Sequence, residues 1–420
     1  MIPFLSVTIF LLGYFAISQE HAIKVSKTSI SIILAVLLWI LVAIGGATGI
    51  SHALSESGGE IFGLVIFLLS AMTLVEILTH YGLFNFVYQK LLDLNLDDKA
   101  QFIIITFLAF VFSAFLDNLT TTIIFLQISR RFFKGKNLVR SASAIVIAAN
   151  AGGVFSPIGD VTTTMLWLSH KFTAQTIFLQ GFLPSLVVFI VSTVLIGRTI
   201  VKSTPDVIEK TSKLGKTEWL VISLCLVSFL FPLFMTLINL PPYFGLLLGL
   251  GMVWLLVDLA KLHSSQSATL SVSIEKFFQK TDIASLYFFI GILLSISALS
   301  HLGILEVMSQ KLFTDTPSTL RIIMGNVAIG GFSAVFDNIP LTAAAMEIIK
   351  TTDPSLWVLL ALTAGVGGSL LLIGSAPGII AMAIVDGLTF KSYLKIASLP
   401  ALIAYILGIL TWYLQYNIFK

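Results

Sequence analysis

Long apolar stretches recur along the whole of this 420-residue chain, and they constrain its fold more than any other feature. Hydrophobic residues make up 57% of the sequence and charged residues only 11%, against roughly 25% charged residues in ordinary soluble domains. A transmembrane helix needs about 20 mainly apolar residues, so the sequence predicts an all-α polytopic membrane protein. We predict spans near 2–18, 29–45, 61–79, 141–169, 176–197, 218–239, 242–260, 283–301, 355–385 and 395–416.

Two further apolar stretches, about 101–133 and 318–350, each carry an Asp-Asn pair at the centre. The first reads Ser113-Ala-Phe-Leu-Asp-Asn118, and the second reads Ser333-Ala-Val-Phe-Asp-Asn338 at a constant spacing. Each stretch is long for one span and is interrupted by polar residues in its middle. This pattern favours a re-entrant hairpin, in which one helical arm enters to mid-depth and a second arm returns after Asp-Asn.

The duplication extends to the spans that follow the hairpins, where the glycine-rich segment 150–159 parallels 365–374. Gly-Gly and Ser-Pro within ten residues predict that the first of these spans is broken near the midplane, and its copy likewise. Each half therefore consists of three spans, a hairpin and two spans. The halves are 1–205 and 206–420, joined by a charged linker at about 198–217.

The charges of the loops predict the orientation of the halves. Basic residues cluster at 130–140 and 198–216, so both segments are expected to be cytoplasmic. Glu56 and Glu60 are expected in the loop before the third span, outside the membrane. Counting spans from these anchors, the first hairpin enters from the cytoplasm and the second from outside. Such inverted-topology repeats are typical of secondary transporters, with sites at the midplane.

Acidic residues inside apolar stretches are the main candidates for function, because an ionised Asp in a bilayer costs a few kcal/mol or more. Asp117 and Asp337 at the two hairpin tips are the primary candidates, and Asp160 in the first glycine-rich break is the third. Carboxylate, carbonyl and hydroxyl oxygens are suitable ligands for an alkali cation. We therefore predict that sodium binds at the two Asp-Asn pairs, Asp117 with Asn118 and Asp337 with Asn338. Candidate neutral ligands are Asn118, Asn338, Ser113, Ser333, Asn150, Thr162, Thr163 and Ser375. The alternative is that Asp-Asn only caps the returning helices.

Three other titratable residues could relay protons. Glu76 and His80 lie four residues apart on one face of the third span, where they could instead pair with each other. Glu347 lies on the returning arm of the second hairpin and is equally open to either interpretation.

Several classes of protein are excluded by what the sequence lacks. The single cysteine, Cys225, allows neither an intrachain disulfide nor a cysteine metal cluster. The sequence contains no phosphate loop, nucleotide fingerprint, His-rich zinc pattern or nucleic-acid motif, which argues against an ATP-driven pump. We expect no cofactor, with sodium and the proton as transported species.

Together these strings resemble the NhaD-type sodium/proton antiporters of the ion transporter superfamily, which also holds arsenite permeases and dicarboxylate transporters. The specific parts are 113–122, 150–165 and 333–338, and the resemblance covers nearly the whole chain. In the dicarboxylate relatives the tips look like Ser-Asn-Thr, without the carboxylates of Asp117 and Asp337. A fixed negative charge suits a cation and repels a dicarboxylate. The resemblance also implies a scaffold, often dimeric, and a transport part that moves against it.

The sequence thus predicts a bacterial inner-membrane antiporter that exchanges cytoplasmic sodium, and also lithium, for external protons by alternating access, and so serves pH homeostasis. Its expected partners are these ions, the lipid bilayer and a second copy as a homodimer, without nucleic acid. A buried carboxylate that holds either the cation or the proton couples the two gradients. The first alternative is a transporter of dicarboxylate or arsenite anions. A remote alternative is an intramembrane aspartyl protease, which needs two adjacent Asp residues as a dyad.

Overall fold

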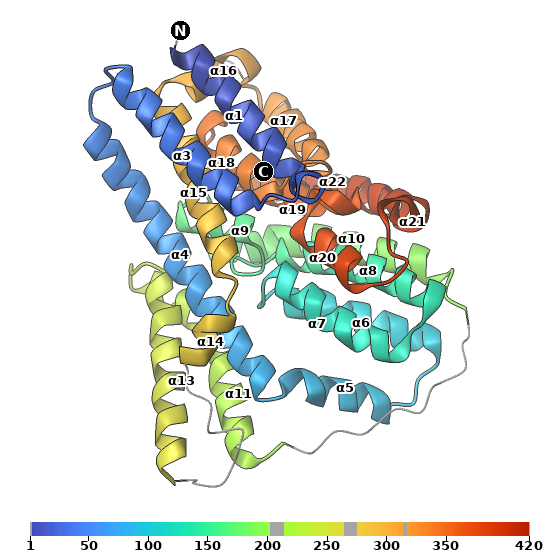
Figure 1. Ribbon diagram of the computed structural model, residues 1–420. Coiled ribbons are helices and arrows are strands. Elements are labelled where there is room, and N and C mark those ends of the chain that lie inside the picture. The colour runs from blue at the N-terminus through green and yellow to red at the C-terminus, as the bar shows by residue number, and fades with distance from the viewer. Residues whose placement is uncertain (1, 202–213, 264–274, 314–316, 420) are drawn as a thin grey trace.

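The computed structural model describes residues 2–201, 214–263, 275–313 and 317–419, and the regular structure in these residues is helical throughout (Figure 1). By length and composition, seven helical segments of this described chain can cross a membrane. Helices satisfy their own backbone hydrogen bonds in lipid, so long apolar sequences of this kind fold as helices. The all-α polytopic fold predicted from the sequence is confirmed.

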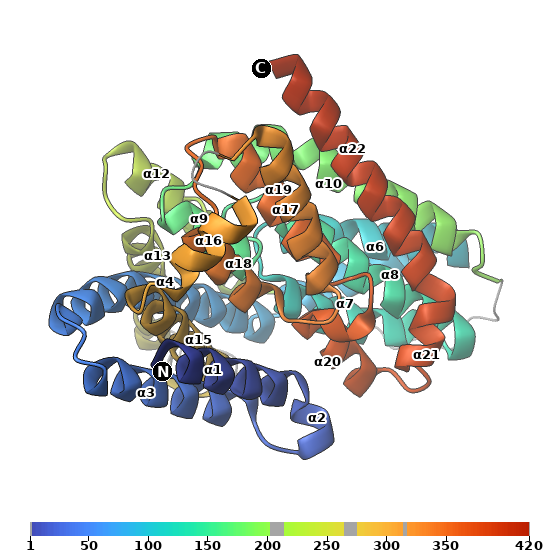
Figure 2. The same ribbon diagram turned by 90° about the horizontal axis from the view of Figure 1, so that it is seen from above.

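One set of helices, here called the long-helix group, contains the N-terminus and most of the long spans. Its members are α1 (Ile2–Ser18), α3 (Lys27–Ile44), α4 (Ile50–His80), α11 (Lys216–Ser228), α12 (Phe231–Leu237), α13 (Tyr243–His263) and α15 (Ile283–His301). Helix α3 packs against both α1 and α15, and α4 packs against α11, α13 and α15. Figure 2 shows α1, α3 and α15 side by side along one edge of the molecule.

Helix α4 is longer than the sequence predicts. It forms one continuous helix of 31 residues, and Glu56 and Glu60 lie within it. The prediction of a loop at these two residues is wrong, because Ala, Leu and Glu favour helix in this stretch and its glycine pair is tolerated. At about 1.5 Å per residue the helix is about 46 Å long, which exceeds the ~30 Å hydrocarbon core.

The remaining spans form a second set, here called the hairpin group, around the two Asp-Asn motifs. The hairpins consist of α6 (Asp98–Ser113) with α7 (Asn118–Phe132), and of α17 (Thr319–Ser333) with α18 (Asn338–Ile348). The broken spans are α8 (Gly135–Gly153) with α9 (Val161–Leu168), and α19 (Pro354–Gly367) with the short turn η1 (Leu372–Gly374) and α20 (Ala376–Ile384). Helices α10 (Ala174–Gly197) and α22 (Leu399–Phe419) pack against each other beside them.

Short helical elements connect the spans of both groups. They are α2 (Glu20–Ile23), α5 (Leu83–Asp93), α14 (Glu275–Lys280), α16 (Ile304–Phe313), α21 (Phe390–Tyr393) and the π-helical turn η2 (Leu394–Ser398).

The second arm of each hairpin begins at its Asp residue. The Asp117 carboxylate accepts a hydrogen bond from the N–H of Thr120 at 2.8 Å. The Asp337 carboxylate accepts one from the N–H of Ile339 at 3.3 Å. Both Asp residues therefore cap a helix, as the sequence predicts, and capping leaves the rest of each carboxylate for other partners.

In both broken spans, the residue that precedes the second helix has the same extended backbone conformation. Asp160 precedes α9 with φ −144° and ψ 146°, and Ser375 precedes α20 with φ −143° and ψ 149°. The Asp160 side chain accepts from the N–H of Thr162, and the Ser375 side chain accepts from the N–H of Gly378. Both predicted breaks are observed, and they differ in that only the first carries a carboxylate.

Each hairpin lies directly against a broken span, with α6 packed on α8 and α17 packed on α19. A Cβ atom on Gly330 of α17 would lie 2.1 Å from the hydroxyl oxygen of Tyr405 in α22 and 2.6 Å from the carbonyl oxygen of Thr363 in α19. A Cβ atom on the neighbouring Gly331 would meet no atom within 4 Å. The close approach of the two helices thus depends on glycine at one position and not at the next.

This difference gives a matched pair of variants. Gly330→Leu is expected to lower the free energy of unfolding by about 1–3 kcal/mol or more, because the backbone of α19 has to move. Gly331→Leu adds an exposed apolar side chain and should change it by less than about 0.5 kcal/mol. Thermal unfolding of the two purified variants in detergent measures the difference. Equal Tm values would contradict the close packing of α17 at Gly330 against α19 and Tyr405.

The division into halves 1–205 and 206–420, and the opposite orientation of the halves in the membrane, stay predictions. Helix α10 ends at Gly197, and most of the expected linker at about 198–217 falls on residues 202–213, outside the described part of the chain.

Candidate functional site

The carboxylate of Asp160 lies where the two hairpin tips meet the first broken span. Asn118 Nδ2, from the first tip, donates to Asp160 Oδ2 at 2.9 Å. Asn338 Nδ2, from the second tip, donates to the same oxygen at 3.4 Å. Asp160 is 2% exposed, and both Asn residues are also buried. Asp160 is therefore the acidic residue that contacts both copies of the Asp-Asn motif.

Asn150 connects this carboxylate to the second broken span. Its Oδ1 accepts from Asn118 Nδ2 at 3.0 Å, and its Nδ2 donates to Ser369 Oγ at 2.8 Å and Ser375 Oγ at 3.2 Å. A single buried hydrogen-bonded cluster thus includes both breaks and both tips. This arrangement brings together five of the residues that the sequence singles out: Asn118, Asn150, Asp160, Asn338 and Ser375.

The threonines that follow Asp160 hold its backbone and leave one oxygen available. Thr163 Oγ1 donates to the carbonyl oxygen of Asp160 at 2.8 Å. Thr162 Oγ1 is buried and has no hydrogen-bond partner among the described residues. The same holds for Thr122 and Thr342, which occupy matching places in the second arms of the hairpins. A buried hydroxyl without a hydrogen-bond partner costs about 1–3 kcal/mol. An ion or a water molecule bound at each of these three hydroxyls would remove that cost.

The two tip aspartates have different surroundings. Thr120 donates to Asp117 through its N–H at 2.8 Å and through its Oγ1 at 2.5 Å. Asp337 Oδ2 instead lies 3.7 Å from Lys27 Nζ, which comes from the start of α3 in the long-helix group. From the sequence we expect the first tip to be the more negative, because its break carries Asp160, and the ammonium of Lys27 beside Asp337 adds a second difference between the tips. The assignment of sodium to these tips stays a prediction.

Ser113 and Ser333 hold the hairpins against the broken spans. Ser113 Oγ donates to the carbonyl oxygen of Ala149 at 2.6 Å. Ser333 Oγ donates to the carbonyl oxygen of Ala364 at 2.7 Å. Because each hydroxyl proton is engaged with a carbonyl, only the oxygen lone pairs remain for a cation.

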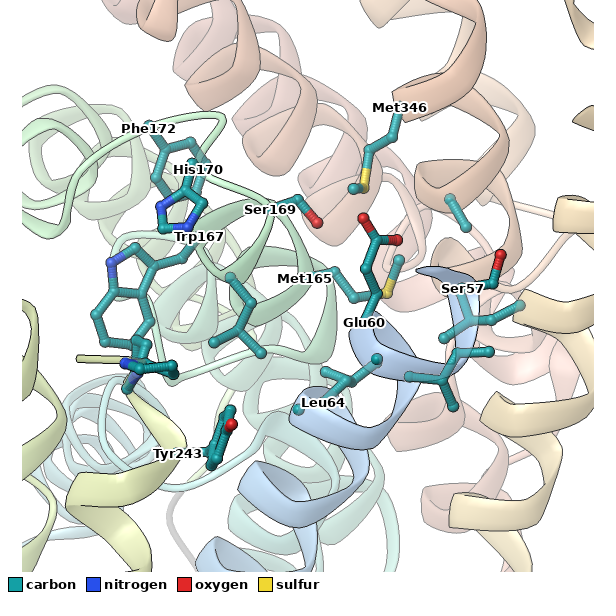
Figure 3. Close-up of a pocket in the computed structure, with 18 of the residues that line it drawn as sticks. Ser57, Glu60, Leu64, Met165, Trp167, Ser169, His170, Phe172, Tyr243 and Met346 are labelled. Carbon is teal, nitrogen blue, oxygen red and sulfur yellow. The ribbon is translucent and has the colours of Figure 1, made fainter. Parts of the chain in front are cut away.

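A cavity of about 1270 Å³ lies between the two helix groups, beside α4, α9, α15 and α18 (Figure 3). Glu56 and Glu60 of α4 and Glu347 of α18 line it. Figure 3 shows the carboxylate of Glu60 pointing toward Ser169 and Met346. Met165 also lines the cavity and belongs to α9, the helix that starts after Asp160. The cavity therefore reaches the element that carries the central carboxylate.

The three residues considered for proton relay lie in different surroundings. Glu347 accepts a hydrogen bond from Ser300 Oγ at 2.5 Å at the wall of the cavity. The His80 ring packs against the rings of Tyr81 and Phe277, with centroids 5.3 Å and 5.1 Å apart. Glu76 is partly buried on the same helix, and neither Glu76 nor His80 lines the cavity. Of the three, Glu347 has the best position to exchange a proton with water in the cavity.

Sequence reasoning missed four residues of this region, one of which is Lys27 beside Asp337. Ser369 follows the Gly367-Gly368 pair inside the second break, which is a signal that could have identified it. Tyr393 OH donates to the carbonyl oxygen of Ser369 at 2.6 Å, a contact between distant elements that no local pattern reveals. Glu60 was assigned to a loop, and its place in the cavity follows from the greater length of α4.

Comparison with known proteins gives consistent matches. A family model described as citrate transporter (CitMHS) matches residues 14–357. Sodium/proton antiporter 1 of Arabidopsis thaliana is 34% identical over 98% of this chain and 72% of its own length. Sodium/proton antiporter 2 of Arabidopsis thaliana is 34% identical over 97% of this chain and 99% of its own length. The Na(+)/H(+) antiporter NhaD of Halomonas elongata is 30% identical over 95% of this chain and 86% of its own length.

Proposed function

Since the chain belongs to the family of the NhaD sodium/proton antiporters, we propose that it exchanges sodium ions for protons across a membrane. The relatives and the matched family are transporters, so the aspartyl protease alternative is set aside.

The observation that carries this proposal is the environment of the Asp160 carboxylate. It is buried, it is contacted by neutral amides from both hairpin tips, and it has no ion pair within the described part of the chain. An uncompensated buried charge costs several kcal/mol, so the carboxylate needs either a proton or a cation. One site with two alternative positive partners is the physical basis of exchange.

We assign separate roles to the groups around this carboxylate. Asp160 takes the proton in one state and faces the sodium ion in the other. The amide oxygens of Asn118 and Asn150 and the free Oγ1 of Thr162 supply neutral ligands for the ion. Asp117 adds negative charge beside Asn118 and attracts the cation to the first tip.

The cavity reaches Met165 of α9, and we propose that it forms the outer part of a route from the site to one side of the membrane. If the basic segment 130–140 faces the cytoplasm, as the positive-inside rule predicts, the cavity with Glu56 and Glu60 faces outward. Protons then enter through it and sodium leaves by the same route. Alternating access requires the hairpin group to move against the long-helix group and to open the site to the cytoplasm.

The finer expectations from the sequence belong to the same proposal. We propose that lithium is also carried, that the exchange serves pH homeostasis, that the chain forms a homodimer and that it requires no resident cofactor. A bacterial inner membrane is the proposed location, although the relatives include plant proteins as well as bacterial ones.

Anion transport is the second candidate, because the matched family is described as citrate transporter. The acidic residues of the site disfavour it. Asp117, Asp160 and Asp337 all lie at the tips or the first break, and three carboxylates would repel a di- or tricarboxylate. A single ammonium, that of Lys27, forms an ion pair with these carboxylates in the described chain.

Everted membrane vesicles with a preset proton gradient test the two candidates together. We expect added NaCl to collapse the gradient, while KCl and choline chloride at the same concentration leave it in place. Citrate and succinate should neither accumulate in sodium-free vesicles to which external NaCl is added nor change the response to NaCl. Sodium-dependent accumulation of either anion, without gradient collapse by NaCl, would replace the antiporter by the anion transporter.

A further inference from the structure

We propose that Lys27 acts as a built-in counter-cation at the second hairpin tip, so that Asp337 is neutralised by the chain itself and only the first tip takes up sodium. This inference rests on the proposed sodium/proton exchange and specifies how the two tips divide it. Lys27 is thereby a residue that sets how many ions the site holds.

The contacts of Lys27 fix its ammonium group beside Asp337. Lys27 Nζ lies 3.7 Å from Asp337 Oδ2 and 4.6 Å from the centre of the Phe288 ring. The backbone N–H of Lys27 donates to Glu20 Oε1 at 2.9 Å, which secures the first residue of α3. The two side chains of the pair are only 23% and 19% exposed. A partly desolvated ammonium on an aromatic face and beside a carboxylate is held more firmly than an exposed lysine.

In the described residues, no ammonium forms an ion pair at the first tip. Asp117 is held by the N–H and the hydroxyl of Thr120, and no ion pair joins Asp117 to another described residue. At the matching place in the second tip stands Pro340, which has neither a backbone N–H nor a hydroxyl to donate. The N–H of Ile339 is the local donor to Asp337, and Lys27 supplies a second, charged partner from another helix.

The broken spans reinforce the same asymmetry. The first break carries Asp160 and the second carries Ser375 at the same backbone position. Within the described chain, the first tip and break hold two carboxylates that form no ion pair. The second tip and break hold one carboxylate, which has an ammonium beside it. A mobile sodium ion is attracted to the first set, whereas at Asp337 it would have to displace a cation tethered to the chain.

The ion pair also joins the two helix groups. Lys27 belongs to α3 in the long-helix group, and Asp337 belongs to the second hairpin. The ring of Tyr14 in α1 packs against Phe336 at the same junction, with centroids 5.4 Å apart. Access of an ion to Asp337 from this side therefore requires separation of the pair, which keeps the second tip closed to sodium.

Equilibrium binding of radioactive sodium to the purified full-length protein tests this proposal. The wild type is expected to bind a single sodium ion per chain. Lys27→Met keeps the apolar stem on Phe288 and removes the charge, so a second sodium ion should bind and the stoichiometry should double. Lys27→Arg should bind one ion as the wild type does. The double variant Lys27→Met/Asp337→Asn should also return to one, because the carboxylate for the second ion is gone.

Lys350→Met is the matched control, because Lys350 pairs with Glu306 in an exposed ion pair away from the tips. It should bind one sodium ion. Unchanged stoichiometry in Lys27→Met, or a second ion that persists in the double variant, would overturn the role of Lys27. If Lys27→Met does not yield monodisperse protein, Asp337→Asn alone decides, because it should still bind one ion, and complete loss of binding would refute the proposal. A wild type that neither binds nor exchanges sodium would contradict the proposed function instead.

Discussion

Asp160→Asn is expected to abolish sodium/proton exchange while the protein still folds. The amide can replace the carboxylate as the cap of α9, because Asn and Asp rank alike as helix caps and the oxygen can still accept from the N–H of Thr162. It can neither release a proton nor balance a cation. A loss of about 3 kcal/mol in the exchange step corresponds to a fall of about a hundredfold or more in the rate of gradient collapse, at any sodium concentration. Everted vesicles with matched expression levels measure this rate.

A second Asp that caps a helix provides the control for this variant. Asp97 caps α6 by accepting from the N–H of Ala100 at 2.9 Å, and it is exposed. Asp97→Asn makes the same chemical change at a helix start outside the site, so exchange should stay at the wild-type rate. Exchange at the wild-type rate in Asp160→Asn would reduce Asp160 to a cap and remove the basis for the proposed mechanism.

The local features of this site could be predicted from the sequence because each is encoded within a few residues. Asp-Asn inside an apolar stretch indicates a helix that stops and restarts, and the structure has helix ends at Ser113 and Ser333. Gly-Gly and Ser-Pro indicate a broken span, and α8 ends at Gly153 as expected. Apolar length indicates the spans, since lipid leaves the backbone few alternatives to helix.

Long-range contacts are the part that could not be predicted. Asp160 was ranked below Asp117 and Asp337, yet it is the residue that contacts Asn118, 42 positions away, and Asn338, 178 positions away. Nothing in the local sequence encodes these contacts, because they result from the packing of the hairpins against the broken spans. The pairing of Asp337 with Lys27 is of the same kind. The position of Glu60 was missed for a different reason, because a polar glycine-containing stretch continues as helix.

Asp117→Asn is expected to weaken sodium binding without abolishing exchange. Asp117 lies next to Asn118 and carries the negative charge of the first tip, but it does not contact Asp160 directly among the hydrogen bonds of the described chain. Removing one charge near a partly solvated ion should cost about 1.4–2.8 kcal/mol, which corresponds to a rise of about tenfold to a hundredfold in the sodium concentration for half-maximal exchange. The sodium dependence of gradient collapse in everted vesicles measures this concentration.

The maximal rate distinguishes attraction of the ion from exchange of the proton. If Asp117 only attracts sodium, a high concentration of sodium should restore the rate in Asp117→Asn to within a few-fold of the wild type. Because Asp160 itself alternates between proton and cation, no concentration of sodium should restore exchange in Asp160→Asn. The Asp117 cap is retained in the variant, since the amide oxygen can still accept from the N–H of Thr120, so a loss of folded protein is not expected. A maximal rate that stays near zero in Asp117→Asn at saturating sodium would place the proton at the first tip and make Asp160 the auxiliary residue.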